Sequence, residues 1–243
     1  MKKLLTTTLI VVTLICCTRA AVGLKGNLMR KMYQITSYTN EDKNLAFLGV
    51  MHLNKQEYFD QIAKDIDSLR NEGYVIFYEG IKKDIDLTDA DRDMYQRKIR
   101  KILGFHFTSY LDETNKDMKK FKVKGYVHQT LSNTGIDATK DINADYNIKG
   151  IIDEFERRRG EIILSNCDLN TPLGVKYSCG KKNQADFDFL TITLRDSLVV
   201  SMIQNSEAKK IALLYGDMHR YTMFNKLKAQ DSTWRFVRRK AQN

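Results

Sequence analysis

The sequence predicts an α/β fold in which helices flank a central mixed β-sheet. Three apolar runs, at 45–51, 74–78 and 211–215, are continuous rather than alternating, which is typical of strands buried on both faces. Between these runs, apolar residues recur at helical spacing, as they do from Gln56 to Arg70. A chain in which strands and helices follow one another in this way favours a layered α/β architecture.

The remaining elements are predicted from local composition. A first strand is expected at 32–38, which is rich in β-forming residues, and a last one around 234–237. Helices are expected wherever apolar residues are three or four positions apart, at 56–70, 89–103, 145–159, 184–205 and 223–229. The stretch between Phe105 and Asn143 is polar and mixed, and we expect it to form a cap or lid of short helices.

The composition is that of one globular domain with a basic surface. Hydrophobic residues make up 42% and charged residues 29% of the 243 positions, which excludes a mainly disordered chain. Lys and Arg number 40 against 30 Asp and Glu, a net charge of +10. These cations are scattered and accompany no recognition motif, so nucleic acid is not an expected partner. No low-complexity linker divides residues 21–243, so a single domain is expected there.

Residues 1–20 have the pattern of a secretory signal. Two lysines precede an uncharged apolar run that ends at Ile15, and this run is too short to span a bilayer. The residues ending at Cys17 resemble a bacterial lipobox, although Cys16 stands where a small residue is usual. We expect an exported protein of the cell envelope that is anchored in the membrane by lipid on Cys17. The alternative is cleavage after Ala20 and a secreted or periplasmic protein.

Cys167 and Cys179 are candidates for a disulfide. In an oxidising compartment they could close the loop at 168–178. The alternative is a pair of reduced thiols, and the sequence leaves both open. Because neither cysteine has the spacing of a zinc-binding pair, a structural zinc site is not expected.

Two segments place the same motif after a buried strand. Gly49-Val50-Met51-His52 and Gly216-Asp217-Met218-His219 are both Gly-x-Met-His, and Glu79 follows a third buried strand. In α/β sheets, ligands bind beyond the carboxyl ends of the strands. Two imidazoles and a carboxylate that meet there could bind one divalent metal ion.

Each of these residues also has an ordinary structural interpretation. A histidine at the end of a strand is commonly just a hydrogen-bonded polar terminus. Glu79 could begin a solvated loop, and Asp217 could cap the helix that follows it. The repetition of the motif in matching surroundings is what favours a metal site.

The ordered set of motifs resembles the TraB/PrgY/Tiki superfamily, whose wider relatives include erythromycin-esterase-like and ChaN-like proteins. The resemblance rests on the two Gly-x-x-His motifs, on Glu79-Gly80 after the intervening strand, and on Arg195-Asp196 in a long helix before the second motif. It implies two pseudo-symmetric halves, each with a Gly-x-x-His at a strand end. It also implies that His52, Glu79 and His219 are the metal and catalytic set, with Arg195 over the same crevice.

The chain departs from the family pattern after the second histidine. Arg220-Tyr221 stand where small or apolar residues are common, which would make the mouth of the site bulkier and more basic. We therefore expect Arg220, together with Asp217 and Arg195, to contact the substrate. His128, in the middle of the chain, could reach the site from a lid or be an ordinary histidine.

The expected function is that of an exported metal-dependent hydrolase. Tiki proteins are metal-dependent proteases that act outside the cell, so the resemblance implies a peptidase. The metal would be manganese, cobalt or zinc, because each suits nitrogen and oxygen ligands. Glu79 would complete the coordination or act as the base, and Arg195 would bind a carboxylate or oxyanion.

Two other classes of protein stay open. One is a lipoprotein that binds a peptide or haem without turnover, since PrgY-type proteins sequester peptide pheromones and ChaN-like relatives bind haem. The other is an esterase without metal, for which the Gly-x-Ser-x-Gly motif is lacking. In each class the expected ligand is a peptide or another small molecule.

Overall fold

The structure is a computed structural model that describes residues 35–82, 84, 86–105 and 124–237. The predicted signal segment with Cys17 lies outside these residues. Within the described part of the chain, no helix has both the length and the apolar character needed to cross a bilayer.

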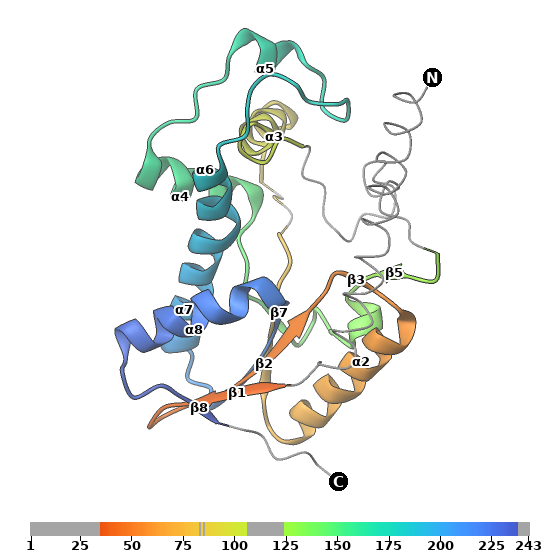
Figure 1. The fold of residues 1–243 in the computed structure, drawn as a ribbon, viewed down its shortest axis with the longest axis vertical. Helices are drawn as coiled ribbons and strands as arrows, with labels where there is room; N and C mark the ends of the chain where they lie inside the picture. The colour runs from red at the N-terminus through yellow and green to blue at the C-terminus, as the bar shows by residue number, and fades with distance from the viewer. Residues whose placement is uncertain (1–34, 83, 85, 106–123, 238–243) are drawn as a thin grey trace, which may run out of the picture.

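A six-stranded mixed sheet forms the centre of the molecule, in the order β6-β4-β7-β2-β1-β8 (Figure 1). The four strands from β6 to β2 are parallel, whereas β1 is antiparallel to both β2 and β8. Their bounds are β1 Thr36–Thr39, β2 Asn44–Val50, β4 Val75–Tyr78, β6 Ile142–Asn143, β7 Lys210–Gly216 and β8 Arg235–Val237. The predicted α/β fold with a mixed central sheet is confirmed.

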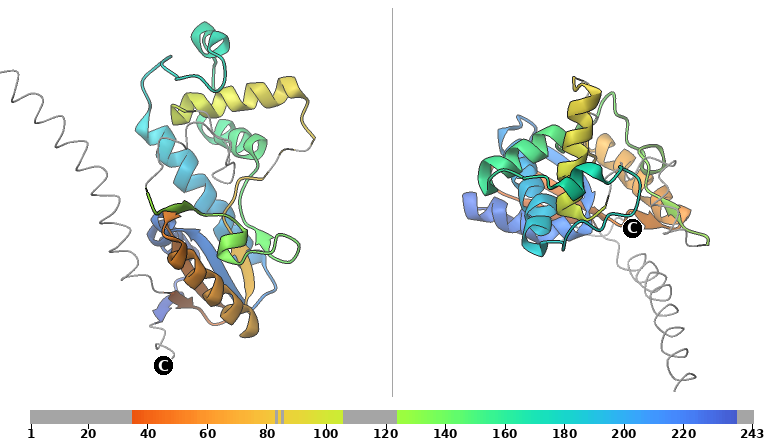
Figure 2. Two further views of the ribbon diagram at one scale, coloured as in Figure 1. Left: turned by 90° about the vertical axis from the view of Figure 1, so that its right-hand side faces the viewer. Right: turned by 90° about the horizontal axis from the view of Figure 1, so that it is seen from above.

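Helices cover both faces of this sheet (Figures 1 and 2). Helix α2 packs on one face, and α7 and α8 pack on the other. A lobe built from α3, α4, α5 and α6 extends away from the sheet. The bounds are α2 Gln56–Asn71, α3 Asp89–Leu103, α4 Ile148–Arg159, α5 Asn166–Asn170, α6 Gln184–Asp188, α7 Arg195–Asn205 and α8 Arg220–Gln230.

The continuous apolar runs are explained by burial of alternate residues on opposite faces. In β2 and β7, Phe47 and Leu213 face α7 and α8, whereas Leu48 and Leu214 face α2. All four side chains are at most 1% exposed. Because side chains alternate across a strand, a central strand covered on both sides must be apolar at every position.

The region between α3 and α4 differs from the predicted cap of short helices. Residues 106–123 lie outside the described part, but the rest contains two short strands and one 3-10 turn, η2 Ser132–Thr134. β6 joins the main sheet, and β5 Val127–His128 pairs with β3 Leu53–Asn54. Two-residue strands leave no periodicity in a sequence, so they could not be predicted.

The predicted helix at 184–205 is one continuous helix with a wider turn inside it. α6 leads into a π-helical segment at Phe189–Leu194, and α7 follows directly. π-helical turns are rare and occur often at functional sites. This one ends immediately before Arg195 and Asp196.

Candidate functional site

The sheet brings the two Gly-x-x-His motifs to the same edge. Strands β2 and β7 are parallel neighbours, so their carboxyl ends lie side by side, with Val50 opposite Gly216. His52 follows β2, whereas His219 ends η4, the 3-10 turn Asp217–His219 between β7 and α8. Glu79 follows β4, on the other side of β7, and its N–H donates to the carbonyl of Leu214 at 3.0 Å.

The side chains of His52, Glu79 and His219 converge at this edge, and we call them the His-Glu-His cluster. Nε2 of His52 lies 3.9 Å from Oε2 of Glu79, and Nε2 of His219 lies 3.9 Å from Oε1 of the same carboxylate. The Glu79 side chain is 6% exposed and the His219 side chain 5%. The convergence expected from the strand-end motifs is therefore present.

The other nitrogen of each imidazole is bound to a side-chain oxygen. Nδ1 of His219 lies 2.6 Å from Oδ1 of Asp196, and Nδ1 of His52 lies 2.8 Å from Oε1 of Gln129. A carboxylate and an amide oxygen accept hydrogen bonds, so each Nδ1 carries the hydrogen when the ring is neutral. Nε2 then has a lone pair on the side of Glu79, which is the tautomer of a metal-binding histidine.

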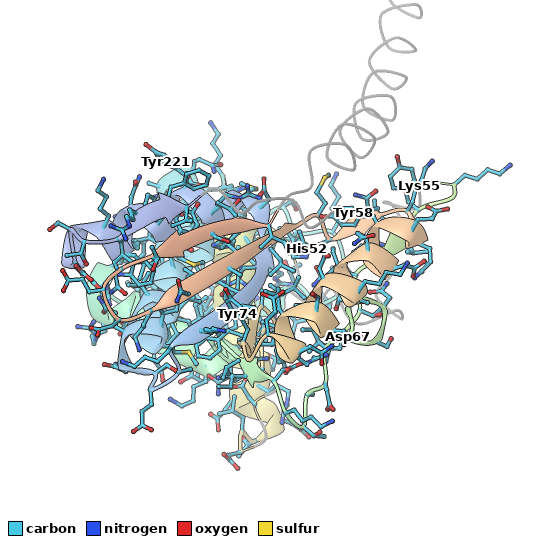
Figure 3. The ribbon with its side chains drawn as sticks, turned by 90° about the horizontal axis from the view of Figure 1, so that it is seen from below. His52, Lys55, Tyr58, Asp67, Tyr74 and Tyr221 are labelled. Carbon is cyan, nitrogen blue, oxygen red and sulfur yellow. A yellow bond between two sulfur atoms is a disulfide. The ribbon has the colours of Figure 1, made fainter. Side chains whose placement is uncertain are left out.

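The chain leaving β2 is held by Tyr58 at the start of α2. The hydroxyl of Tyr58 accepts from the N–H of Met51 at 3.1 Å and donates to the carbonyl of Gly49 at 3.3 Å. Burial raises the pKa of this phenol to about 12, so the hydroxyl keeps its proton. The two bonds fix the backbone just before His52, which lies beside Tyr58 in Figure 3.

Arg195 links Glu79 to a second buried carboxylate. Its Nη2 donates to Oε1 of Glu79 at 2.5 Å, and its Nε donates to Oδ1 of Asp145 at 3.0 Å. Burial by itself would raise the pKa of Glu79. The positive charge of Arg195 is the largest opposing effect, and together with the imidazoles of His52 and His219 and the N–H of Gly216 it lowers that pKa to about 2. Glu79 is therefore ionised at any physiological pH.

Arg195 lies in the site, but its hydrogen-bond partners differ from those expected. The prediction placed it over the crevice as a binder of substrate anions, whereas two of its nitrogens are bound to Asp145 and Glu79. Among the described residues, none accepts a hydrogen bond from its Nη1. Its first role is to position Glu79.

Asp217 and Arg220 are paired with each other, away from the His-Glu-His cluster. A Cβ at Gly49 would meet both of their side chains. Arg220 also donates to Thr36 at 2.9 Å, and its guanidinium lies over the ring of Phe47. The structure therefore does not bring these two predicted substrate contacts to the cluster. Nor does Asp217 cap the following helix with its side chain.

Gly216 leaves an open position in the middle of the cluster. A Cβ there would lie 3.2 Å from Oε2 of Glu79, 3.3 Å from Nε2 of His52 and 3.4 Å from Cδ2 of His219. The two motif glycines are offset by one residue, since Gly49 pairs with Tyr215 and Val50 with Gly216. Because side chains alternate between the two faces of a sheet, residues offset by one position point to opposite faces. Of the two motif glycines, only Gly216 is therefore on the face where the His-Glu-His cluster lies.

The donor set fits a divalent metal ion. Two imidazole nitrogens and a carboxylate suit manganese, cobalt and zinc, and the oxygens on both Nδ1 atoms orient the rings. Ligand atoms of one zinc ion lie about 3–3.5 Å apart, so the 3.9 Å separations require a small inward shift. In the part of the chain that the structure describes, no three His, Cys, Asp or Glu side chains are yet at ligand spacing.

Three residues around the cluster were not predicted to act in it. Asp145 follows the two-residue strand β6, and Gln129 follows β5. Asp196 was noted only as part of the Arg-Asp pair. Gln129, the neighbour of His128, is the residue that contacts His52. The Arg-Asp pair was the one sequence signal that could have identified Asp196.

Comparison with protein-family models, curated proteins and solved structures finds no match.

Proposed function

We propose that this chain is a metal-dependent hydrolase whose metal ion would be held by His52, His219 and Glu79. The observation that carries the proposal is the arrangement of the two imidazoles. Both Nε2 atoms face one carboxylate, and both Nδ1 atoms are bound to oxygen. Glu79 already accepts from Arg195 and from the N–H of Gly216, and a divalent cation bound among the carboxylate and the two Nε2 lone pairs would interact favourably with all three.

A divalent metal bound there would act as a Lewis acid and lower the pKa of a coordinated water to about 7. Glu79 supplies negative charge to the site and stays ionised, because its pKa is about 2. A base works best when its pKa lies near the working pH. Of the two roles predicted for Glu79, the role of ligand is therefore the one that the geometry favours.

The surrounding residues hold the cluster in place. Asp196 accepts the Nδ1–H of His219 and also binds the hydroxyl of Thr222. Arg195 fixes Glu79 against Asp145, which leaves Nη1 to bind a substrate carbonyl or carboxylate. Arg195 thus positions the ligand Glu79 and can still contact the substrate.

A peptide is the proposed substrate, on the resemblance to Tiki proteins. Next to His219, the side chains of Met218 and Tyr221 are 81% and 76% exposed, and Tyr221 projects outward from α8 in Figure 3. These exposed apolar side chains, on the turn and the helix that follow β7, can contact the apolar side chains of a peptide.

The activity is tested with a pool of fluorogenic peptides. We expect cleavage that stops with a chelator and returns when manganese, cobalt or zinc is added. Cleavage that persists in chelator would refute a metal-dependent mechanism. A metal-loaded protein that cleaves nothing would instead be a binding protein.

The proposed location is the cell envelope, with lipid on Cys17 as the anchor. The mature N-terminus tests this by mass spectrometry. We expect a lipid-modified N-terminus at Cys17, and Cys17→Ser should abolish it. An unmodified N-terminus at Ala21 would show ordinary signal cleavage instead.

A further inference from the structure

Residues 160–183 form the tip of the lobe, at the end of the molecule farthest from β8 (Figures 1 and 2). The tip contains α5, and the disulfide between Cys167 and Cys179 closes it. The sequence left this pair open as thiols or a disulfide, and the structure joins them. A loop closed in this way has far fewer conformations than an open one.

Two arginines of α3 hold the tip by its backbone. Arg97 donates to the carbonyls of Asp168, Leu169 and Thr171, and Arg100 donates to those of Asp168, Thr171 and Pro172. Arg100 is completely buried. Because these carbonyls face inward to α3, the tip has a fixed shape.

Three large apolar side chains project from this tip into solvent. Ile163 is 74% exposed, Leu169 50% and Val175 51%. Ile162, in contrast, is 8% exposed, so the chain does bury apolar residues here where a partner exists. Several exposed apolar residues on one rigid projection indicate an interaction surface.

The charge around these side chains is positive. Residues 160–183 contain three lysines and two acidic residues, Glu161 and Asp168. Asp168 is buried and paired with Lys101, so it does not offset the surface charge. No described acidic residue forms an ion pair with the three exposed lysines of the tip, which are Lys176, Lys181 and Lys182.

We propose that this tip docks on an anionic lipid bilayer. Ile163, Leu169 and Val175 would enter the boundary between headgroups and acyl chains, and the lysines would contact the anionic headgroups. Apolar side chains beside Lys and Arg are the pattern of surfaces that lie on membranes. A nucleic acid is disfavoured because Tyr177, the one aromatic residue of 160–183, lies against Arg100 instead of being open for base stacking.

Insertion is tested by fluorescence in the full chain. Trp234 is the only tryptophan and is 2% exposed, so a second tryptophan in place of Leu169 reports on the tip. We expect vesicles of brominated phosphatidylcholine and phosphatidylglycerol to quench Leu169→Trp. The matched control is Phe236→Trp, at a position 58% exposed on β8, which should not be quenched. This readout is local, so attachment through the N-terminal residues does not reproduce it.

Charge reversal tests the second half of the proposal. In the Leu169→Trp background we expect Lys176→Glu, Lys181→Glu and Lys182→Glu together to raise the vesicle concentration for half-maximal quenching about 100-fold. This follows because each lysine near an anionic surface contributes a factor of about five. The control carries Lys64→Glu, Lys140→Glu and Lys228→Glu, at three exposed positions elsewhere. It should raise the vesicle concentration for half-maximal quenching far less.

Three outcomes would overturn the proposal. The first is no quenching at position 169 on anionic vesicles. The second is equal quenching at positions 169 and 236. The third is an equal effect of the two triple reversals, which would mean that net charge alone matters. A tip that no vesicle quenches would have to serve a protein partner instead.

Discussion

Nδ1 of His219 lies 2.6 Å from a carboxylate oxygen of Asp196, a residue 23 positions earlier in the chain. The bond joins α7 to the turn that follows β7, and both side chains are almost completely buried. Asp196 is fixed in turn by the hydroxyl of Thr222 on α8. One ring orientation is thereby selected, and in it Nε2 of His219 faces Glu79.

Asp196→Asn should weaken metal binding without unfolding the protein. The amide keeps the size of the carboxylate but removes the charge that orients and polarises His219, and such losses cost about 10–100-fold in metal affinity. Isothermal titration with zinc or manganese measures this. Affinity equal to wild type would show that Asp196 supports only the fold.

Gly216→Ala should block the cluster sterically. The backbone at Gly216 has φ −52° and ψ 135°, which alanine adopts readily, so the substitution tests space alone. The new methyl would lie between His52 and Glu79, and we expect metal affinity to fall by about tenfold or more. In the control, Gly80→Ala, the nearest atom is 3.6 Å away, and affinity should be unchanged. Equal affinity in both variants would place the metal elsewhere.

The sequence predicted those parts of the fold and site that depend on long patterns. The buried runs of β2 and β7 and the histidines after them were all visible as motifs. Gln129 and Asp145 were not, because each follows a strand of only two residues. The pairing of Asp217 with Arg220 could not be predicted either, since it depends on the one-residue offset between the motif glycines.

Arg195→Ala should be strongly destabilising. It would leave the carboxylates of Glu79 and Asp145 buried without their cation, and breaking a buried pair costs about 3–5 kcal/mol. Arg195→Lys should recover part of this, because the charge returns without the planar fork. Urea unfolding measures both variants. The exposed pair of Arg157 with Glu154 is the control, and Arg157→Ala should cost less than about 1 kcal/mol. Similar costs for Arg195→Ala and Arg157→Ala would contradict the positioning role of Arg195.

Stability should fall in acid partly because of Glu79. Its pKa is about 2 in the folded chain against an ordinary 4.5, so its stabilising contribution is complete above the ordinary value. That contribution is lost as the pH falls from about 5 to about 2. Glu79→Gln does not titrate, and we expect its free energy of unfolding to change less than that of wild type between pH 6 and pH 3. Both proteins are measured in chelator. If their free energies of unfolding change equally between pH 6 and pH 3, Glu79 is not held ionised.

The metal content of purified protein tests the central claim most directly. After saturation with manganese, cobalt or zinc and removal of free ions, we expect about one ion per chain in wild type. We expect little in His52→Ala or His219→Ala, since one imidazole and a carboxylate bind such ions weakly. His128→Ala alters a half-buried histidine next to Gln129 and should keep the ion. Wild-type protein that retains none of the three metals, or a His219→Ala protein that retains as much as wild type, would contradict the proposed site.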